Sequence, residues 1–104
     1  MATVEEARAE RDLFHDLRVK AEEVGDALYR RPCPERIDGR SCVDVANGRA
    51  HARGFGWDGI DPADLHFECG AYWFASVATQ RLRRLECLAE IALAEAERAA
   101  AREV

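Results

Sequence analysis

The sequence predicts a mainly α-helical protein in which two long antiparallel helices form a coiled-coil-like helical hairpin, with a small β-hairpin inserted between them. Two observations predict the helices: apolar residues at three- and four-residue steps over residues 4–29, and a strict alternation of four- and three-residue steps over residues 71–99. A third observation, the dipeptide Asn47-Gly48 between short alternating runs, favours a β-hairpin turn. We expect a single domain over residues 1–104 that forms a homodimer.

Length and composition narrow the class of protein. The chain has 104 residues, which suffice for one hydrophobic core but leave too few for a second. Hydrophobic residues make up 48% of the chain and charged residues 34%, a balance typical of globular proteins rather than disordered or membrane-spanning ones. Because charged residues follow the initial methionine closely, we expect no secretory signal, no membrane association and a cytoplasmic location.

The first helix is predicted over residues 4–29. Thr3 and Glu6 have the spacing of a capping box, in which side chains satisfy the free amides of the first turn. Pro32 ends the pattern, because a proline lacks the amide that a helix needs and restricts the residue before it. The apolar stripe of this helix consists of Leu13, Phe14, Leu17, Ala21, Val24 and Leu28.

Residues 30–60 are predicted to contain an irregular loop and then the β-hairpin. Pro32, Pro34 and Gly39 prevent regular structure in the loop. In the register set by the turn, Asp44 would lie opposite His51, as an acid that orients a general base. No nucleophile with a convincing partner stands near this pair in the sequence, and exposed cross-strand ion pairs are far commoner than catalytic pairs, so we expect no catalytic residues.

The second helix is predicted over residues 62–101. Asp61 is a suitable N-cap, and Pro62 suits the first helical position. The heptad seam of this helix is mostly alanine, and further apolar residues such as Leu88 and Ile91 lie off it. Because only one other long helix is predicted, the second apolar face favours self-association. The residues expected at an interface are Ala75, Ala78, Leu82, Leu85, Ala89 and Ala92.

Four residues are candidates for a metal site: Cys33, Cys42, His66 and Cys69. Thiolates and imidazole suit zinc, and His66 and Cys69 stand three positions apart near the predicted start of the second helix. His51 could replace one of them. However, Cys33 and Cys42 stand nine positions apart, and the paired two-residue spacing of zinc knuckles is missing. The sequence therefore favours buried thiols without a cofactor, and zinc is the alternative.

Charge is distributed unevenly along the chain. The net charge is -5, yet residues 30–53 carry six arginines against three acidic residues, which makes this segment basic. Arg40, Arg49 and Arg53 are therefore candidate contacts to a partner or to nucleic acid. We expect a non-enzymatic regulator, inhibitor or adaptor that binds a protein partner through acidic helices and a basic hairpin. The alternatives are a nucleic-acid-binding regulator with a hairpin fixed by zinc and a small metal-dependent enzyme.

Overall fold

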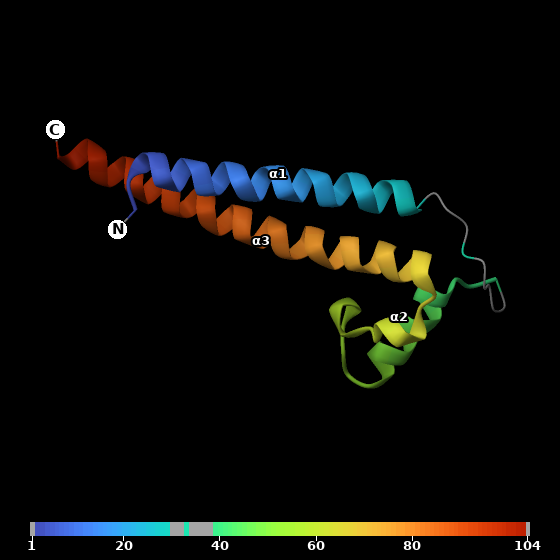
Figure 1. Ribbon diagram of the computed structural model, residues 1–104. Coiled ribbons are helices and arrows are strands. Elements are labelled where there is room, and N and C mark those ends of the chain that lie inside the picture. The colour runs from blue at the N-terminus through green and yellow to red at the C-terminus, as the bar shows by residue number, and fades with distance from the viewer. Residues whose placement is uncertain (1, 30–32, 34–38, 104) are drawn as a thin grey trace. The chain divides into compact units, whose positions relative to one another are not determined.

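The computed structural model describes residues 2–29, 33 and 39–103 (Figure 1). Its helices are α1 (Val4–Tyr29), α2 (Cys42–Ala52) and α3 (Phe67–Arg102), with two short 3-10 turns, η1 (Trp57–Gly59) and η2 (Pro62–Asp64), between α2 and α3. The described residues contain no β-strand. The prediction of a mainly helical chain is therefore confirmed, and that of a β-hairpin is wrong. The predicted loop with Pro32 and Pro34 lies outside the described residues, apart from Cys33 and Gly39.

Helix α2 occupies the segment for which the hairpin was predicted. Its N-cap is Ser41, whose hydroxyl accepts the amide of Asp44, while the Asp44 carboxylate accepts the backbone amide of Ser41. The buried residues of α2 recur at helical spacing: Cys42, Val43, Ala46 and Ala50. This capping box and this periodicity outweigh the turn preference of Asn47-Gly48, which lies exposed in the middle of the helix.

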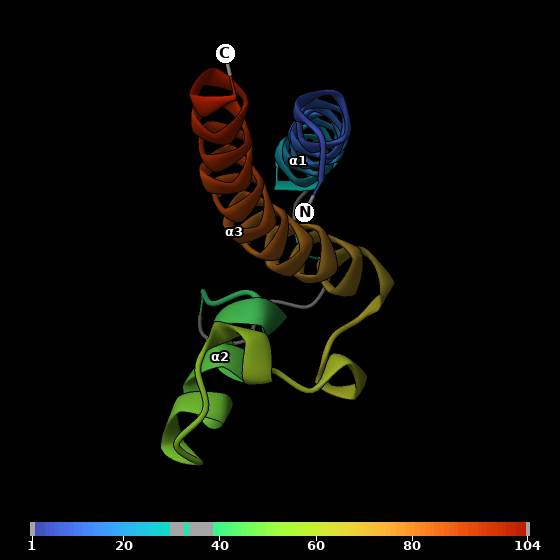
Figure 2. The ribbon, with the colours of Figure 1, turned by 90° about the vertical axis from the view of Figure 1, so that its left-hand side faces the viewer.

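The chain divides into two compact units. The first unit comprises Met1–Ala21 with Ala78–Val104, and the second unit comprises Glu22–Val77. In the first unit, α1 and α3 lie side by side in two perpendicular views (Figures 1 and 2). They run antiparallel, because Ala7 near the start of α1 packs with Leu93 and Ala96 near the end of α3.

The first helix begins as the sequence predicts. The Thr3 hydroxyl accepts the amide of Glu6 at 3.2 Å, and the Glu6 carboxylate accepts the Thr3 hydroxyl rather than its backbone amide. One half of the predicted capping box is therefore present, and it is enough to start α1 at Val4.

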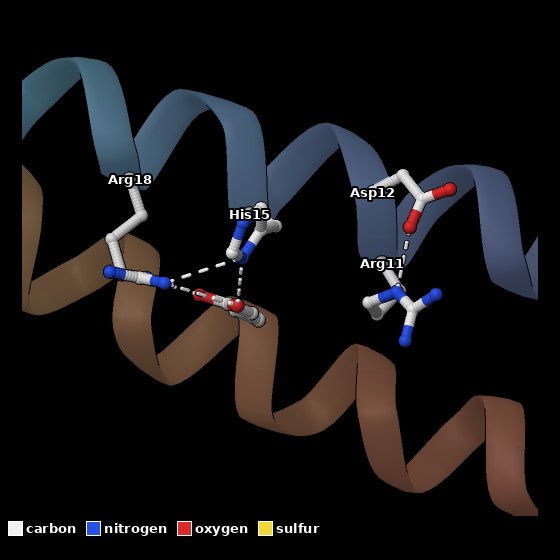
Figure 3. A network of polar contacts seen from close by, with 5 residues as sticks. Arg11, Asp12, His15 and Arg18 are labelled. Atoms are coloured by element: carbon white, nitrogen blue, oxygen red, sulfur yellow. Dashed lines mark hydrogen bonds and ion pairs between the residues drawn. The ribbon is translucent and has the colours of Figure 1, made fainter.

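A polar network joins the two helices of the first unit (Figure 3). Glu86 of α3 is buried, accepts a hydrogen bond from the Arg18 guanidinium, and lies 2.8 Å from His15 Nδ1 through Oε1. Arg18 first, and then His15, lower the pKa of Glu86 to about 2. Arg11 instead pairs with its neighbour Asp12 at 2.7 Å. The buried glutamate is thus charged at neutral pH and held by cationic and polar groups of α1.

The second unit packs α2 against the start of α3. Its core cluster consists of Ala46, Ala50, Ile60, Trp73 and Val77, with Trp57 and Leu65 packed against it. The Trp73 indole donates to the Trp57 carbonyl at 2.8 Å, and the Trp57 indole donates to Ser76 Oγ at 3.2 Å. The backbone carbonyl and the indole of Trp57 are therefore both hydrogen-bonded to side chains of α3.

The connection between α2 and α3 explains why the long helix begins later than predicted. Asp61 accepts the amide of Ala63 at 3.0 Å and Pro62 follows it, so the predicted cap is present, but it starts only the single turn η2. Leu65 then adopts an extended conformation with φ -113° and ψ 139°. Helix α3 consequently begins at Phe67. None of the described helices has the length and apolar character that crossing a bilayer requires.

Candidate metal centre

Four ligand residues converge in the second unit. Cys33, Cys42, His66 and Cys69 each offer one ligand atom, and these atoms all lie within 4.8 Å of one another. Cys33 precedes α2, Cys42 is the first residue of α2, His66 immediately precedes α3, and Cys69 lies in the first turn of α3. The fold thus brings together the residues that the sequence nominated as the alternative zinc site, although their spacing in the chain is irregular.

Two sulfur–nitrogen distances within this cluster are comparable to those around a tetrahedral metal. His66 Nδ1 lies 3.0 Å from Cys42 Sγ and 3.8 Å from Cys33 Sγ, and the Cys42 amide donates to Cys33 Sγ at 3.5 Å. Zinc–sulfur bonds of about 2.3 Å and zinc–nitrogen bonds of about 2.0 Å place tetrahedral sulfur and nitrogen ligands roughly 3.5 Å apart. The two observed sulfur–nitrogen separations lie on either side of that value.

Two helix starts lie at the ligand cluster. Cys42 and Cys69 both lie in the first turn of a helix, and the His66 carbonyl accepts the amide of Gly70 at 2.9 Å, which starts α3. Helix N-termini carry partial positive charge and unpaired amides, both of which stabilise a thiolate. Two helix starts therefore point at one cluster of sulfur atoms.

The electrostatics of the cluster favour a bound cation. Burial raises the pKa of the Cys69 thiol, and its contacts with Cys42 and Cys33 raise it further. Three adjacent sulfur atoms in a partly buried site cannot all ionise unless a positive charge joins them. His66 Nδ1 faces the sulfur atoms, whereas its Nε2 is buried and has no hydrogen-bond partner within the described residues. A divalent metal bound at Nδ1 would leave the proton on Nε2.

No disulfide links the described cysteines, and the fourth of them, Cys87, is exposed in the first unit. Cys42 is buried, while Cys33 and Cys69 are half-buried, so water has limited access to the sulfur atoms of the cluster. Cys87 does not belong to the ligand cluster. It therefore serves as a matched control for substitutions of the ligand cysteines.

The cross-strand pairing expected of Asp44 and His51 is not formed, because both residues lie on one helix. Asp44 caps the start of α2 through Ser41, and His51 lies seven residues further along the same helix, exposed to solvent. Seven residues of α-helix span about 10 Å, which is too far for a hydrogen bond between the two side chains. Asp44 could orient the His51 imidazole only across a hairpin, and the described structure has a helix there instead. His51 is also not part of the ligand cluster.

The three candidate arginines lie on the surface of the second unit. Arg49 is exposed and lies 3.9 Å from Asp64, and exposed Arg53 is the C-cap residue of α2. Arg40 is exposed one residue before the N-cap. Residues 39–77 contain only these three arginines as basic residues, against five acids: Asp44, Asp58, Asp61, Asp64 and Glu68. This part of the unit is therefore acidic overall.

The predicted interface residues are distributed between the interior and the surface. Ala75 and Ala89 are buried, Ala78 and Leu82 are half-buried, and Leu85 and Ala92 are exposed. The face of α3 that is buried in the first unit consists of Glu86, Ala89, Leu93 and Ala96. This face shares Ala89 and Ala96 with the predicted seam, but it has Glu86 and Leu93 where the seam has Leu85 and Ala92.

Sequence reasoning missed a cavity beside the ligand cluster. Tyr29, Trp57 and Tyr72 line it together with two ligand cysteines, Cys33 and Cys69. These aromatic residues come from three segments with no common periodicity, so no pattern in the sequence marks them as a group.

No protein-family model, curated protein or solved structure matches this chain.

Proposed function

We propose that the protein is a non-enzymatic zinc-binding interaction module. In this proposal, zinc bound by Cys33, Cys42, His66 and Cys69 fixes α2 against the start of α3, and the resulting scaffold binds a protein partner. The observation that carries the proposal is the convergence of four ligand atoms within 4.8 Å. Three thiolates and one imidazole are a common donor set of structural zinc sites.

The number of ligands argues for a structural role rather than a catalytic one. Four protein ligands fill the tetrahedral coordination of zinc, so no position is left for a water molecule or a substrate. The core cluster of the second unit has five members, and two of them, Ala46 and Ala50, are alanines that bury little apolar surface. Small units of this kind depend on a metal or another cross-link for stability.

Removal of zinc tests the proposal through the stability of the second unit. Both tryptophans of the chain, Trp57 and Trp73, lie in this unit, so their fluorescence reports its folding. We expect a strong chelator to unfold the second unit, and Cys42→Ser to do the same without chelator. Cys87→Ser should behave as the unsubstituted chain. Equal stability with and without chelator, together with equal stability of the two serine variants, would contradict the proposal.

Cobalt substitution separates the structural role from the enzymatic alternative. Co(II) in a closed tetrahedral site should show an absorption spectrum that does not change when azide is added, because no coordination position exchanges. A change on addition of azide would indicate an open position and would favour a metal-dependent enzyme.

Charge supports a protein partner over nucleic acid. The acidic excess over residues 39–77 disfavours a phosphate backbone, and Arg49 already lies beside Asp64. A surface of this kind attracts a basic or cationic segment of a partner instead.

We also propose that a second copy of the chain covers one side of the first unit. Leu13 and Leu17 of α1 and Leu85 and Leu88 of α3 are between 41% and 55% exposed. Each of these leucines stands one position before a residue that faces the other helix. In an antiparallel pair of helices, residues with this placement all lie on the same side of the pair. Because each helix contributes two leucines, a copy related by a twofold axis would place leucine against leucine. The opposite side carries charged and polar residues: Arg8, His15, Glu90 and Glu97.

A further inference from the structure

A cavity of about 520 Å³ lies beside the ligand cluster in the second unit. Its volume is within the range of about 300–1,000 Å³ that is usual for ligand pockets. Three aromatic residues, Tyr29, Trp57 and Tyr72, line it together with two acidic residues, Asp44 and Glu68. Aromatic faces together with acidic groups are suited to a cation.

The three rings are in contact but are not stacked. Tyr29 and Tyr72 have ring centroids 5.7 Å apart with an interplanar angle of 44°, and Trp57 meets Tyr72 edge to face at 6.4 Å and 77°. Rings inclined in this way present aromatic surface in more than one direction. The orientation of Trp57 is fixed, because its indole donates to Ser76 and its carbonyl accepts from Trp73. This part of the cavity is therefore preorganised.

The charge of the cavity is negative. Burial raises the pKa of Tyr72, and the negative charges of Asp26 and Asp44 raise it further, as does Tyr29. The wall formed by Cys33 and Cys69 would also be anionic, because a zinc ion with three thiolates and a neutral imidazole retains one negative charge. No lysine or arginine occurs among the lining residues that the structure describes.

We infer that this cavity binds the methylated ammonium group of a lysine side chain presented by a partner protein. Aromatic faces attract organic cations through their quadrupoles, and methyl groups reduce the cost of removing the cation from water. The cavity is also lined by Leu28 and Val43, which would contact the aliphatic part of a lysine side chain. The inference rests on the proposed function, because zinc supplies one wall of the cavity and the partner supplies the lysine.

A titration of the zinc-loaded full chain tests this inference. The probes are a short peptide that contains trimethyllysine, the same peptide with an uncharged tert-butyl isostere of that side chain, and tetramethylammonium chloride alone. Trp57 lines the cavity, so tryptophan fluorescence reports binding. We expect the trimethyllysine peptide to bind at least about 10-fold more tightly than its neutral isostere, which has the same shape but no charge.

Two variants localise the binding. Tyr29 is 74% exposed at the end of α1, so Tyr29→Ala should leave the fold intact and weaken peptide binding about 5-fold. Phe67 is 90% exposed and does not line the cavity, so Phe67→Ala is the matched control and should bind normally.

The outcomes distinguish this inference from the proposed function. Zinc content and tryptophan fluorescence are measured on the same sample, so a chain without zinc contradicts the proposed function itself. A folded, zinc-loaded chain that binds the neutral isostere as tightly as the trimethyllysine peptide, or that binds neither, overturns only the inference. Tetramethylammonium that binds as tightly as the peptide overturns the assignment to a partner's side chain, since a free quaternary ammonium ion would then suffice.

Discussion

Replacing Gly48 with alanine tests whether residues 42–52 form a helix or a hairpin. Gly48 is exposed, and a Cβ atom placed on it would meet no heavy atom within 4 Å, so the substitution changes only the backbone preference. In the interior of a helix, alanine is favoured over glycine by about 0.8–1.0 kcal/mol. We therefore expect Gly48→Ala to raise the free energy of unfolding of the second unit by about 0.5–1 kcal/mol.

A helix and a hairpin over residues 42–52 predict opposite signs for the change in the free energy of unfolding. In a type I′ turn over Asn47-Gly48, both residues need a positive φ, which costs an alanine roughly 1–2 kcal/mol. Urea denaturation of the zinc-loaded chain, followed by tryptophan fluorescence, measures the difference. A decrease in the free energy of unfolding would refute the helical assignment of α2.

Gly54 provides the control for this experiment. A Cβ atom at this position also meets no heavy atom within 4 Å, but its φ is +82°. Gly54→Ala should therefore destabilise the same unit by about 1 kcal/mol. Because the two substitutions are chemically identical and equally uncrowded, opposite signs can come only from the backbone conformation.

Three further predictions concern the first unit and the surface. Because the pKa of Glu86 in the folded chain is about 2, against 4.5 in the absence of its partners, the pairing stabilises the first unit above pH 4.5, and this contribution is lost as the pH falls toward 2. Circular dichroism melts should show Glu86→Gln to be less stable than the unsubstituted chain at neutral pH, with the difference vanishing near pH 2; a difference that is constant with pH would contradict this. Analytical ultracentrifugation should show a dimer that Leu17→Glu with Leu88→Glu converts to a monomer, whereas a monomeric unsubstituted chain would exclude the second copy. On heparin at low salt, Arg49→Ala with Arg53→Ala should elute as the unsubstituted chain does; strong retention that these substitutions abolish would favour nucleic-acid binding instead.

The start of α1 could be predicted because local chemistry determines it. Thr3 and Glu6 start the helix at Val4 through a contact between neighbours in the sequence. The described part of α1 extends to Tyr29, and the predicted stop at Pro32 lies outside the described residues. The interior of the long helix could be predicted for the same reason, since a regular apolar spacing is a local property. Its start could not, because Pro62 supports one short turn as readily as a long helix.

The error in the middle of the chain arose from two competing local signals. Asn47-Gly48 is typical of a hairpin turn, but Ser41 and Asp44 form a capping box that the sequence also contains. Neither signal alone decides between strand and helix. The helical alternative prevails because it buries a row of small residues of α2 against the start of α3, and this tertiary contact is not visible in a local window.

The interface and the metal centre show the limit of spacing arguments. The predicted seam consists of apolar residues and does not include Glu86, which is nevertheless buried and paired with Arg18. The ligand residues could be nominated by type, since thiolates and imidazole suit zinc. Their convergence depends on the contact between α2 and α3, and no spacing between Cys33 and Cys42 predicts it.

The zinc-binding module that we propose requires the cluster of Cys33, Cys42, His66 and Cys69 to bind one zinc ion. Native mass spectrometry of the chain purified without chelator, repeated after denaturation, tests it most directly. We predict a folded species heavier by one zinc ion per chain, loss of that mass on denaturation or in Cys42→Ser, and its retention in Cys87→Ser. A folded chain without metal, with the mass of the polypeptide alone, would contradict the claim.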